Sequence, residues 1–463
     1  MRRFIFLFLV LAGTAWAQET STANAAQQDP PDEIGKLRKN CPFTHLLGCA
    51  EVLFTGQPLH IAVGSIAPQN GFGAGLAYVG HHDTDNWSTS WSADAVASNN
   101  ASWRTGIYVK FVDTHLKPAR PELGTENADA SDVPVYTEQP VFNLYAQSIS
   151  LNKLTFFGLG PSTTTSGRSF YGMTEHIFGG NAIRPIYERL NVGFYGEING
   201  RAVNIRPSTG QPSPSIGQIY TPETAPGLAN QPFFVQLGVG LRMRPSAFHN
   251  HLHFNYDVAY RPYFAVSDSS FSFQRLTVDL YQEYSIYHTN MRVPRDTNGP
   301  NDCLIDSAVE HPRCPKVTMR SREGKFGLRV RTELSMTPGG DTVPFYFQPT
   351  LGGADINGNP WLPSFQDYRF RAPNVILLRQ NFEHTIWGPL GFALSADEGK
   401  VALNRGDLGP NPWIRSYSTG LTLRAGGFPQ VFLLFSWGGN EGTHTIANVN
   451  TSLLGVSSRP SLY

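Results

Sequence analysis

The sequence predicts an all-β protein, a transmembrane antiparallel β-barrel of the outer-membrane type with about sixteen strands. Two observations predict this fold. From residue 60 onward, segments of roughly ten residues alternate apolar with polar side chains, and this length suits a strand that crosses a bilayer. Past residue 17, no apolar run approaches the length of a spanning helix. Strands, rather than helices, are therefore expected to cross the lipid.

The segment 325–336 shows the alternation clearly. One face carries Phe326, Leu328, Val330, Thr332, Leu334 and Met336, and the other carries Lys325, Gly327, Arg329, Arg331, Glu333 and Ser335. Segments 103–111, 274–287 and 416–424 divide in the same way. A period of two places the two sets on opposite faces of a strand. A soluble sandwich would also alternate, but the ionic groups on the polar faces favour a hydrated lumen inside a closed barrel.

About sixteen strands are expected, near residues 71–82, 87–98, 102–113, 141–150, 168–183, 190–205, 232–245, 252–265, 271–287, 324–337, 343–352, 374–386, 390–403, 414–425, 429–439 and 446–455. If the first strand starts on the periplasmic side, the external connections include the long segments 114–140, 288–323 and 353–373. The periplasmic connections then include the short segments 99–101, 266–270, 338–342, 387–389 and 426–428. The long connection 206–231 does not fit this order, which indicates a misplaced strand between 140 and 231.

The first residues have the pattern of a signal peptide. A basic start, Met1-Arg2-Arg3, precedes the apolar run FIFLFLVLAG and the small residues Ala15 and Ala17. The apolar run is too short for a membrane anchor. We expect cleavage after residue 17, export to the bacterial outer membrane, a partly disordered periplasmic segment over 18–59, and a barrel over 60–463.

The four cysteines form two near pairs, Cys41 with Cys49 and Cys303 with Cys314. An exported chain meets an oxidising compartment, so two short-loop disulfides are expected, paired by proximity. A zinc site is the alternative, but the spacings do not fit one.

Composition and motifs exclude several functions. The chain has 36 basic and 36 acidic residues, and this balance argues against a nucleic-acid partner. No Gly-x-Ser-x-Gly elbow, His-Glu-x-x-His motif or phosphate-binding loop is found. The sequence therefore predicts a protein that is not an enzyme.

Three groups of side chains have an alternative interpretation, as catalytic acids, metal ligands or a lipolytic pair. They are, in that order, Asp397 with Glu398 and Glu383; His249, His251 and His253 on one strand face; and Ser285 with His288. Each group has a more common explanation. Carboxylates in a barrel lumen usually pair with arginines, histidines often lie at a strand end, and Ser285 and His288 are close only in sequence. We expect no catalytic residue, no metal and no cofactor.

Three stretches resemble the bacterial surface antigen family, the barrel domain of the outer-membrane protein assembly factors. They are HIAVGSIAPQNGFGAGLAYVGHH (60–82), FFGLGPSTTTSGRSFYGMTEHIF (156–178) and the segment 351–401. The third contains a glycine pair, a long polar loop, a strand with a central Glu383, and then Asp397-x-Gly399. In that family the loop between the eleventh and twelfth strands folds back into the lumen, which here implies a lumen-entering loop over 353–373.

The resemblance also implies site residues. They are Phe365, Asp367, Arg369, Phe370 and Arg371 in the loop, with Glu383, Asp397 and Gly399 as partners on the wall. The family's loop carries Arg-Gly-aromatic at its tip, whereas this chain has Pro363-Ser364-Phe365. The family's arginine would pack against Asp397. We hypothesise that Arg369 or Arg371 takes its place.

The resemblance implies insertion or translocation of protein, or of lipid, at the outer membrane. Outer-membrane lipid and assembly partners in the periplasm or the outer membrane are implied with it. The stretch between residue 17 and the first expected strand is too short for the periplasmic repeat domains of the family. The strand 446–455 is short and polar, so the seam between the first and last strands is expected to open laterally. A passive pore for small solutes and a surface structural antigen are the alternative functions.

Overall fold

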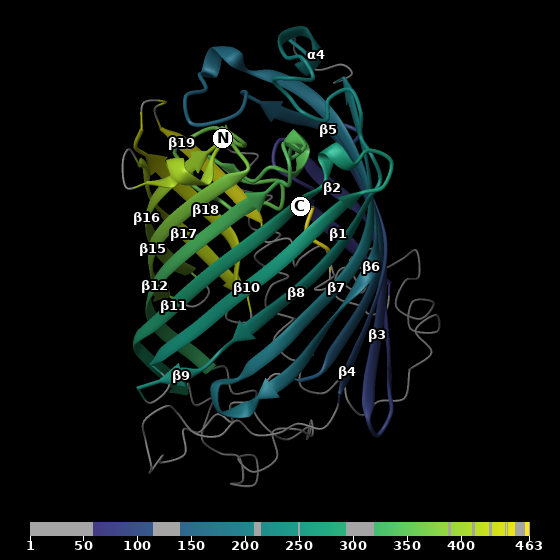
Figure 1. The fold of residues 1–463 in the computed structure, drawn as a ribbon. Helices are drawn as coiled ribbons and strands as arrows, with labels where there is room; N and C mark the ends of the chain where they lie inside the picture. Colours follow the sequence, from purple (N-terminus) through teal and green to yellow (C-terminus); the bar gives the residue numbers. More distant parts are fainter. Residues whose placement is uncertain are drawn as a thin grey trace, which may run out of the picture.

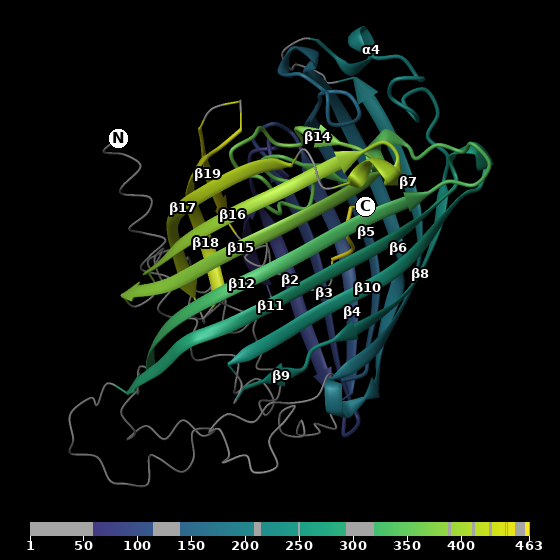
Figure 2. The same cartoon turned by 60° about the vertical axis from the view of Figure 1, so that its left-hand side comes forward.

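The structure, a computed structural model, describes residues 59–113, 139–207, 214–248, 251–292, 319–387, 390–409, 413–425, 428–439, 441, 443–449 and 459–462. Within these residues, 17 strands form one antiparallel sheet, which curls into a barrel (Figures 1 and 2). The two-residue β9 (Ser246–Ala247) only flanks β10, which leaves sixteen strands in the wall. The wall strands are β1 (Leu59–Ser65), β2 (Phe72–Asp83), β3 (Trp87–Ser98), β4 (Trp103–Asp113), β5 (Val141–Phe156), β6 (Ser169–Tyr187), β7 (Val192–Pro207), β8 (Phe234–Met243), β10 (Leu252–Ala265), β11 (Phe273–Arg292), β12 (Met319–Met336), β15 (Asn374–Trp387), β16 (Leu390–Ala402), β17 (Ile414–Ala425), β18 (Phe428–Trp437) and β19 (His444–Val449).

Each wall strand pairs antiparallel with the next wall strand along the chain. Between β12 and β15 the chain forms a separate small hairpin of β13 (Thr350–Leu351) and β14 (Phe370–Arg371). The edge strands β1 and β19 lie side by side. No register pairs them within the described residues. The sheet is therefore an up-and-down barrel with a seam between its first and last strands.

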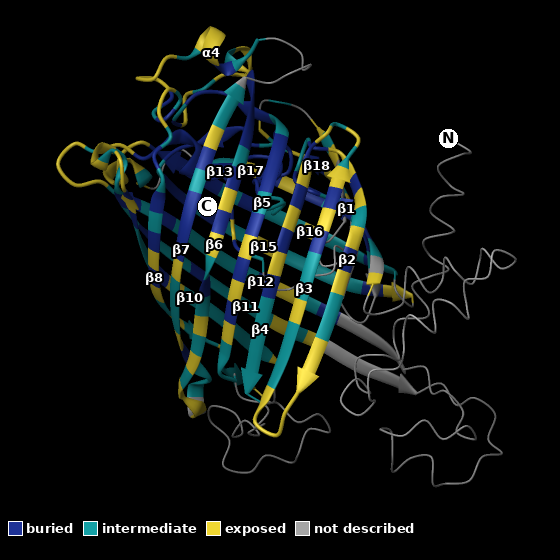
Figure 3. Ribbon diagram, turned by 90° about the vertical axis from the view of Figure 1, so that its right-hand side faces the viewer, coloured by how far each residue is buried: buried dark blue, intermediate teal, exposed yellow. Residues whose placement is uncertain are grey.

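The two faces of the wall strands separate as the alternation predicted. On β4, Trp103 and Ile107 are exposed on the outer surface, while Arg104 and Tyr108 are buried on the lumen side. On β11, Tyr284 and Ile286 point outward, and Arg275 is buried inside. Figure 3 shows exposed and buried residues alternating along the strands. The prediction of an all-β antiparallel barrel is confirmed.

Exposed aromatic side chains gather near both ends of the wall. At the end of the barrel that carries α4 (Ile216–Ile219), called the upper end below after its place in Figure 1, they include Trp103, Phe264 and Trp437. At the opposite, lower end they include Trp87, Tyr187 and Trp387. Two aromatic girdles around an apolar band are typical of barrels in the outer membrane. In the described ranges, no helix has the length and apolarity to cross a membrane.

The helical segments within the described residues are short. Besides α4 they are the 3-10 turns η1 (Thr165–Gly167), η2 (Glu188–Leu190), η3 (Ser269–Phe271), η5 (Phe345–Phe347) and η6 (Arg405–Leu408).

One strand was missed and one was predicted where the wall has none, and these two errors cancel in the count. The first wall strand, β1, lies over 59–65, where no strand was expected. The predicted strand 343–352 is instead the turn η5 followed by the two residues of β13. Phe345, Tyr346 and Phe347 are all buried, whereas a barrel strand would send alternate side chains outward. Pro344 and Pro349 on either side also disfavour a central strand.

These corrections also reassign the ends of the barrel. With β1 as the first strand, the connection over 208–233 shares the upper end with the loop over 337–373. The strands that flank 114–140 and 293–318 place these two connections at the lower end. The predicted grouping of 114–140 and 288–323 with 353–373 is therefore wrong. Each end carries both long and short connections. The strand error expected between 140 and 231 lies instead at the missed strand β1.

The core of the molecule lies inside the barrel. Phe345 and Phe347 of η5 pack against inward aromatic side chains of the wall, with Phe347 5.0 Å from Phe234 and Phe345 5.2 Å from Tyr171 between ring centroids. Tyr368 is also fully buried in this cluster. A barrel of this size has room for such a filling because its diameter grows with strand number. The upper half of the lumen is thus a packed interior.

The predicted signal peptide, the segment 18–58 and the four cysteines Cys41, Cys49, Cys303 and Cys314 lie outside the described residues. Cleavage after residue 17 and the two disulfides stay predictions.

Candidate functional site: the loop in the barrel lumen

The loop over 337–373 leaves the upper end of β12, enters the lumen and returns to β15. Its base is closed by the β13–β14 hairpin. Gly352 and Gly353 follow β13 with φ of 103° and 61°. Their amides donate to the carbonyls of Trp361 and Leu362, at 3.0 and 3.1 Å. A Cβ at Gly353 would lie 2.5 Å from the backbone nitrogen of Asp367. Only glycine therefore fits where the chain turns back on itself.

Asp355 organises the inner turn of the loop. Its carboxylate accepts bonds from the amide and the side chain of Asn359, at 2.8 and 2.9 Å, and from the indole nitrogen of Trp361, at 3.1 Å. Aspartate favours such turns because its short side chain bonds the backbone a few residues ahead. The turn fixes the orientation of the Trp361 ring.

Three arginines of the wall surround the Trp361 ring. The guanidinium carbons of Arg379, Arg329 and Arg331 lie 4.6, 5.3 and 5.8 Å from its centroid. Cation–π contacts of this kind strengthen when they are shielded from water, and Trp361 is buried. The aromatic ring carried by the loop therefore serves as a common contact for positive charges of β12 and β15.

Asp397 on β16 is the wall residue that holds the loop. Its side chain is fully buried and accepts a bond of 2.9 Å from the backbone amide of Leu362. Arg379, opposite on β15, donates two bonds of 2.7 and 2.5 Å to the same carboxylate and a third to the carbonyl of Pro360. Bidentate arginine–carboxylate pairs are among the stronger polar contacts in proteins. The wall supplies both charges here, and the loop supplies backbone groups.

The hypothesis that Arg369 or Arg371 packs against Asp397 is wrong. Arg369 pairs with Glu441 at 2.5 Å and donates to the side chain and the carbonyl of Thr163, at 2.8 and 2.6 Å. Arg371 donates to the carbonyl of Phe345, at 2.7 Å. Both arginines follow Tyr368, which has a left-handed backbone conformation with φ of 61°. Arg379 takes the place that the hypothesis gave to them.

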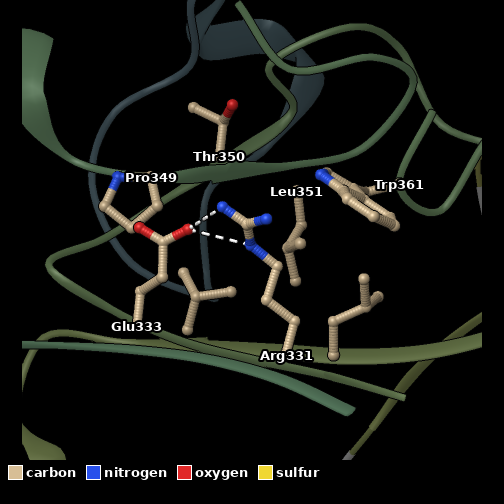
Figure 4. A pocket seen from close by; sticks show the side chains of 8 residues that line it. Arg331, Glu333, Pro349, Thr350, Leu351 and Trp361 are labelled. Carbon is tan, nitrogen blue, oxygen red and sulfur yellow. Dashed lines mark hydrogen bonds and ion pairs between the residues drawn. The ribbon is translucent and has the colours of Figure 1, made fainter. Parts of the chain in front are cut away.

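A small recess separates the loop from the wall beside this contact (Figure 4). Thr350, Leu351 and Trp361 of the loop line one side, and Arg331 and Glu333 of β12 line the other. The two charged side chains pair with each other at 2.7 Å. Since these charges already satisfy each other, the recess belongs to the packing of the loop.

The three stretches of family resemblance meet at the loop. From the first stretch, the carbonyl of Pro68 accepts a bond of 3.0 Å from the hydroxyl of Tyr368. From the second stretch, Thr163 receives the two bonds from Arg369, and the amide of Gly160 donates to the carbonyl of Arg371 at 2.8 Å. The third stretch contains the loop and Asp397. Segments far apart in the sequence therefore hold one inserted element.

Of the remaining predicted residues, Phe365, Asp367 and Phe370 lie in the loop, and Gly399 and Glu383 lie on the wall. Phe365 and Phe370 pack together, with ring centroids 5.2 Å apart. Asp367 accepts a bond of 2.9 Å from the amide of Ala354. A Cβ at Gly399 would lie 2.8 Å from a methyl of Leu351, so its absence lets the loop approach β16.

Glu383 lies on β15 opposite Lys325 of β12. It is farther from the upper end than Arg379, which is the β15 residue seen to bond the loop. The position of Glu383 beside the loop stays a prediction.

The alternative interpretation of the histidines as metal ligands concerns residues outside the loop. His251 bonds the carbonyl of Ser285 at 2.9 Å, and His249 lies outside the described residues. No group of three or more metal-ligating side chains occurs within the described ranges. The geometry around the loop is that of a brace, with paired charges, stacked rings and backbone bonds.

The fold and the site define a class of protein, an outer-membrane-type β-barrel whose lumen is braced by an inserted loop. No family model matches the chain, and no curated protein does. Among solved structures it is similar to CdiB from Escherichia coli (TM-score 0.47, 10% identity), to CdiB from Acinetobacter baumannii (0.44, 12%) and to BamA from Haemophilus ducreyi lacking POTRA domains 1-3 (0.44, 9%).

These matches cover 85%, 84% and 85% of this chain, in the same order, and 62%, 59% and 70% of the other chains. The chain thus spans less than two thirds of either CdiB chain. Identities and TM-scores this low assign no activity, substrate or partner to the chain.

Proposed function

We propose that this barrel acts in the bacterial outer membrane in the insertion or translocation of protein, or of lipid, and that it catalyses no covalent reaction. The observation that carries the proposal is the loop held across the lumen by Asp397 and Arg379. A lumen filled in its upper half by a braced loop is poorly suited to free diffusion. A passage or an opening must then be made by a change in the barrel.

The seam is the part of the wall that can open with the smallest loss of bonds. Within the described residues, β1 has 7 residues and β19 has 6, whereas their neighbours β2 and β18 have 12 and 10. Short edge strands offer few backbone groups to each other, so their pairing is weak. Lateral opening at this seam would expose a strand edge to an incoming β-segment, which can add to it as another strand.

Reconstitution tests the proposal directly. The purified chain is placed in liposomes of outer-membrane lipid, and an unfolded outer-membrane barrel protein is added. We expect its insertion, measured by protection from protease, to exceed that in empty liposomes. Equal insertion in the two preparations contradicts the proposal.

A cysteine lock at the seam tests the mechanism. Pairs of cysteines scanned along 59–65 and 444–449 are oxidised and then reduced. We expect oxidation to suppress insertion and reduction to restore it. A matched pair at Thr419 and Phe435, which face each other within the β17–β18 register, is expected to leave insertion unchanged. Suppression by both pairs alike would show that the seam has no special role.

Conductance separates the two alternative functions. A passive pore gives a large and steady conductance in planar bilayers, and a structural surface antigen gives neither conductance nor insertion. We expect a small, fluctuating conductance that rises when 353–373 is deleted, because the loop occupies the lumen.

The lipid partner is expected to contact the outward girdles of aromatic residues, and periplasmic or outer-membrane assembly partners belong to the same proposal.

A further inference from the structure

A second segment of the chain also lies inside the barrel. Residues 459–462, with the sequence Arg-Pro-Ser-Leu, follow the last wall strand in the chain. The mark for this end of the chain falls within the outline of the barrel in Figures 1, 2 and 3. Pro460 and Leu462 are buried, so the segment is packed into the lumen.

The first anchor of this segment is Asp94 on β3. Its side chain is fully buried. One oxygen, Oδ2, accepts bonds from Arg104 of β4 at 3.1 Å and from Arg459 at 2.7 Å. Its other oxygen has no partner among the described residues. A buried carboxylate is costly unless it is paired and bonded. Asp94 is therefore a site that selects a positive side chain from the lumen.

The second anchor is Arg201 on β7, which is almost fully buried. It bonds Glu175 of β6 at 3.0 Å and donates to the carbonyl of Ser461, also at 3.0 Å. The ion pair of the wall holds Arg201 in place, and the remaining donor of its guanidinium binds the peptide backbone. This contact recognises an extended chain without regard to the side chain at that position.

The third anchor joins the segment to the loop. The amide of Leu462 donates to the side chain of Asn357, at 3.0 Å. The Leu462 side chain joins the buried cluster that includes Ile356 and Tyr145. The segment therefore connects the inner turn of the loop with the β3–β7 side of the wall.

We propose that the lumen contains a peptide-binding site on β3, β4 and β7, which takes an extended peptide with a basic residue followed three positions later by an apolar one. The chain's own segment 459–462 occupies this site as an internal ligand. It fills the part of the lumen beside that wall which the loop leaves open. This inference needs only the arrangement inside the barrel and does not rest on the proposed function.

The test measures conductance in planar bilayers. A chain shortened to end at residue 458 is expected to conduct better than the full chain. The synthetic peptide acetyl-SRPSLY, which corresponds to residues 458–463, is expected to block the shortened chain again. The same peptide with glutamate in place of arginine is expected to block at least about tenfold less well, because a charge-assisted bond to a buried group is lost.

A point variant of the full chain decides the matter even if the shortened chain fails to fold. In the full chain, Arg459→Glu is expected to raise conductance, while Arg415→Glu, a change at an exposed arginine of β17, is expected to leave it unchanged. In the shortened chain, Asp94→Asn weakens the peptide block. Asp257→Asn, at a carboxylate paired with Arg242, leaves the block as it was. Heat-modifiable mobility on gels confirms that each variant is folded.

Two results would overturn the inference. One is equal conductance of the full chain and its Arg459→Glu variant, both folded. The other is an equal block by the two peptides, which would show a nonspecific obstruction of the lumen.

Discussion

Two buried aspartates on different sides of the barrel hold two inserted segments in related ways. Asp397 on β16 and Asp94 on β3 are both fully buried, and each pairs with an arginine of the neighbouring strand. Each also accepts one bond from an insert. At Asp397 the donor is the backbone amide of Leu362, and at Asp94 it is the guanidinium of Arg459.

The difference lies in the source of the positive charge. At Asp397, the single arginine comes from the wall, and the loop adds no charge. At Asp94 the wall already supplies Arg104, and the insert brings a second arginine. Loss of the insert therefore leaves Asp94 still paired. The loop is thus a structural part of the barrel, whereas the segment 459–462 is bound as a ligand that can leave.

The largest expected effect is on the loop side of the comparison. Arg379→Ala removes the partner of a fully buried carboxylate and is expected to lower the free energy of unfolding by about 3–5 kcal/mol. Arg459→Ala leaves Asp94 with Arg104 and is expected to cost only about 1 kcal/mol. Urea unfolding in detergent measures both. Equal losses in the two variants would remove the distinction between brace and ligand.

A second variant tests how the loop is held at the rim. Arg369→Ala removes the ion pair with Glu441 and the two bonds to Thr163. We expect it to lower the free energy of unfolding by about 2–4 kcal/mol. Arg369→Lys is expected to recover little, because an ammonium cannot reproduce the planar fork of donors. Full recovery by lysine would mean that charge alone matters at this position.

A pair of glycines in the same loop separates close packing from backbone strain. Gly353 and Gly358 both have positive φ, of 61° and 84°, but only at Gly353 would a Cβ meet the backbone of Asp367. Gly353→Ala is expected to cost about 2–4 kcal/mol and Gly358→Ala about 1 kcal/mol. Thermal unfolding of the two variants measures the difference. Similar losses would place the cost in the backbone conformation alone.

The smallest expected effect is a pH dependence from the loop. Burial raises the pKa of Asp367 above its ordinary value, although the bond from Ala354 and the charge of His444 act in the opposite direction. The stability linked to a raised carboxyl pKa is complete below the unfolded pKa of about 4 and is lost as pH rises through the folded pKa.

Asp367→Asn is expected to remove this loss and to flatten the stability profile above about pH 4, up to the raised pKa of the folded state. Unfolding midpoints across that range, compared with the parent chain, measure the change. An unchanged profile would show that Asp367 does not titrate separately from its surroundings.

Much of the barrel could be predicted from the alternation, but one strand was missed and one was predicted where the wall has none. The run 343–352 has the aromatic composition of a strand, yet its rings fill the lumen, and period-two alternation is absent from Phe345 to Phe347. The strand β1 has only 7 residues, too few for a clear pattern. Because every strand reverses direction, one missed strand exchanged the ends of all connections up to β12.

The site was predicted in part. Gly399 and Asp397 were placed against the loop by their motif, and both contact it. Arg379 was missed, although pairing the two predicted strands on either side of the short connection 387–389 brings it opposite Asp397. The segment 459–462 carried no signal, since a short polar run does not indicate where it binds.

The sequence by itself determined most of the strands and their two faces, because period two and turn residues act over a few neighbouring positions. The inserted loop was implied by the resemblance of the segment 351–401 to a known family. Only the tertiary structure decided which charge meets which. Arg379, Arg369 and Arg459 are all arginines that face the interior, and nothing local distinguishes their partners. Those partners are set by the register between strands and by the path of the loop and the segment 459–462 through the lumen.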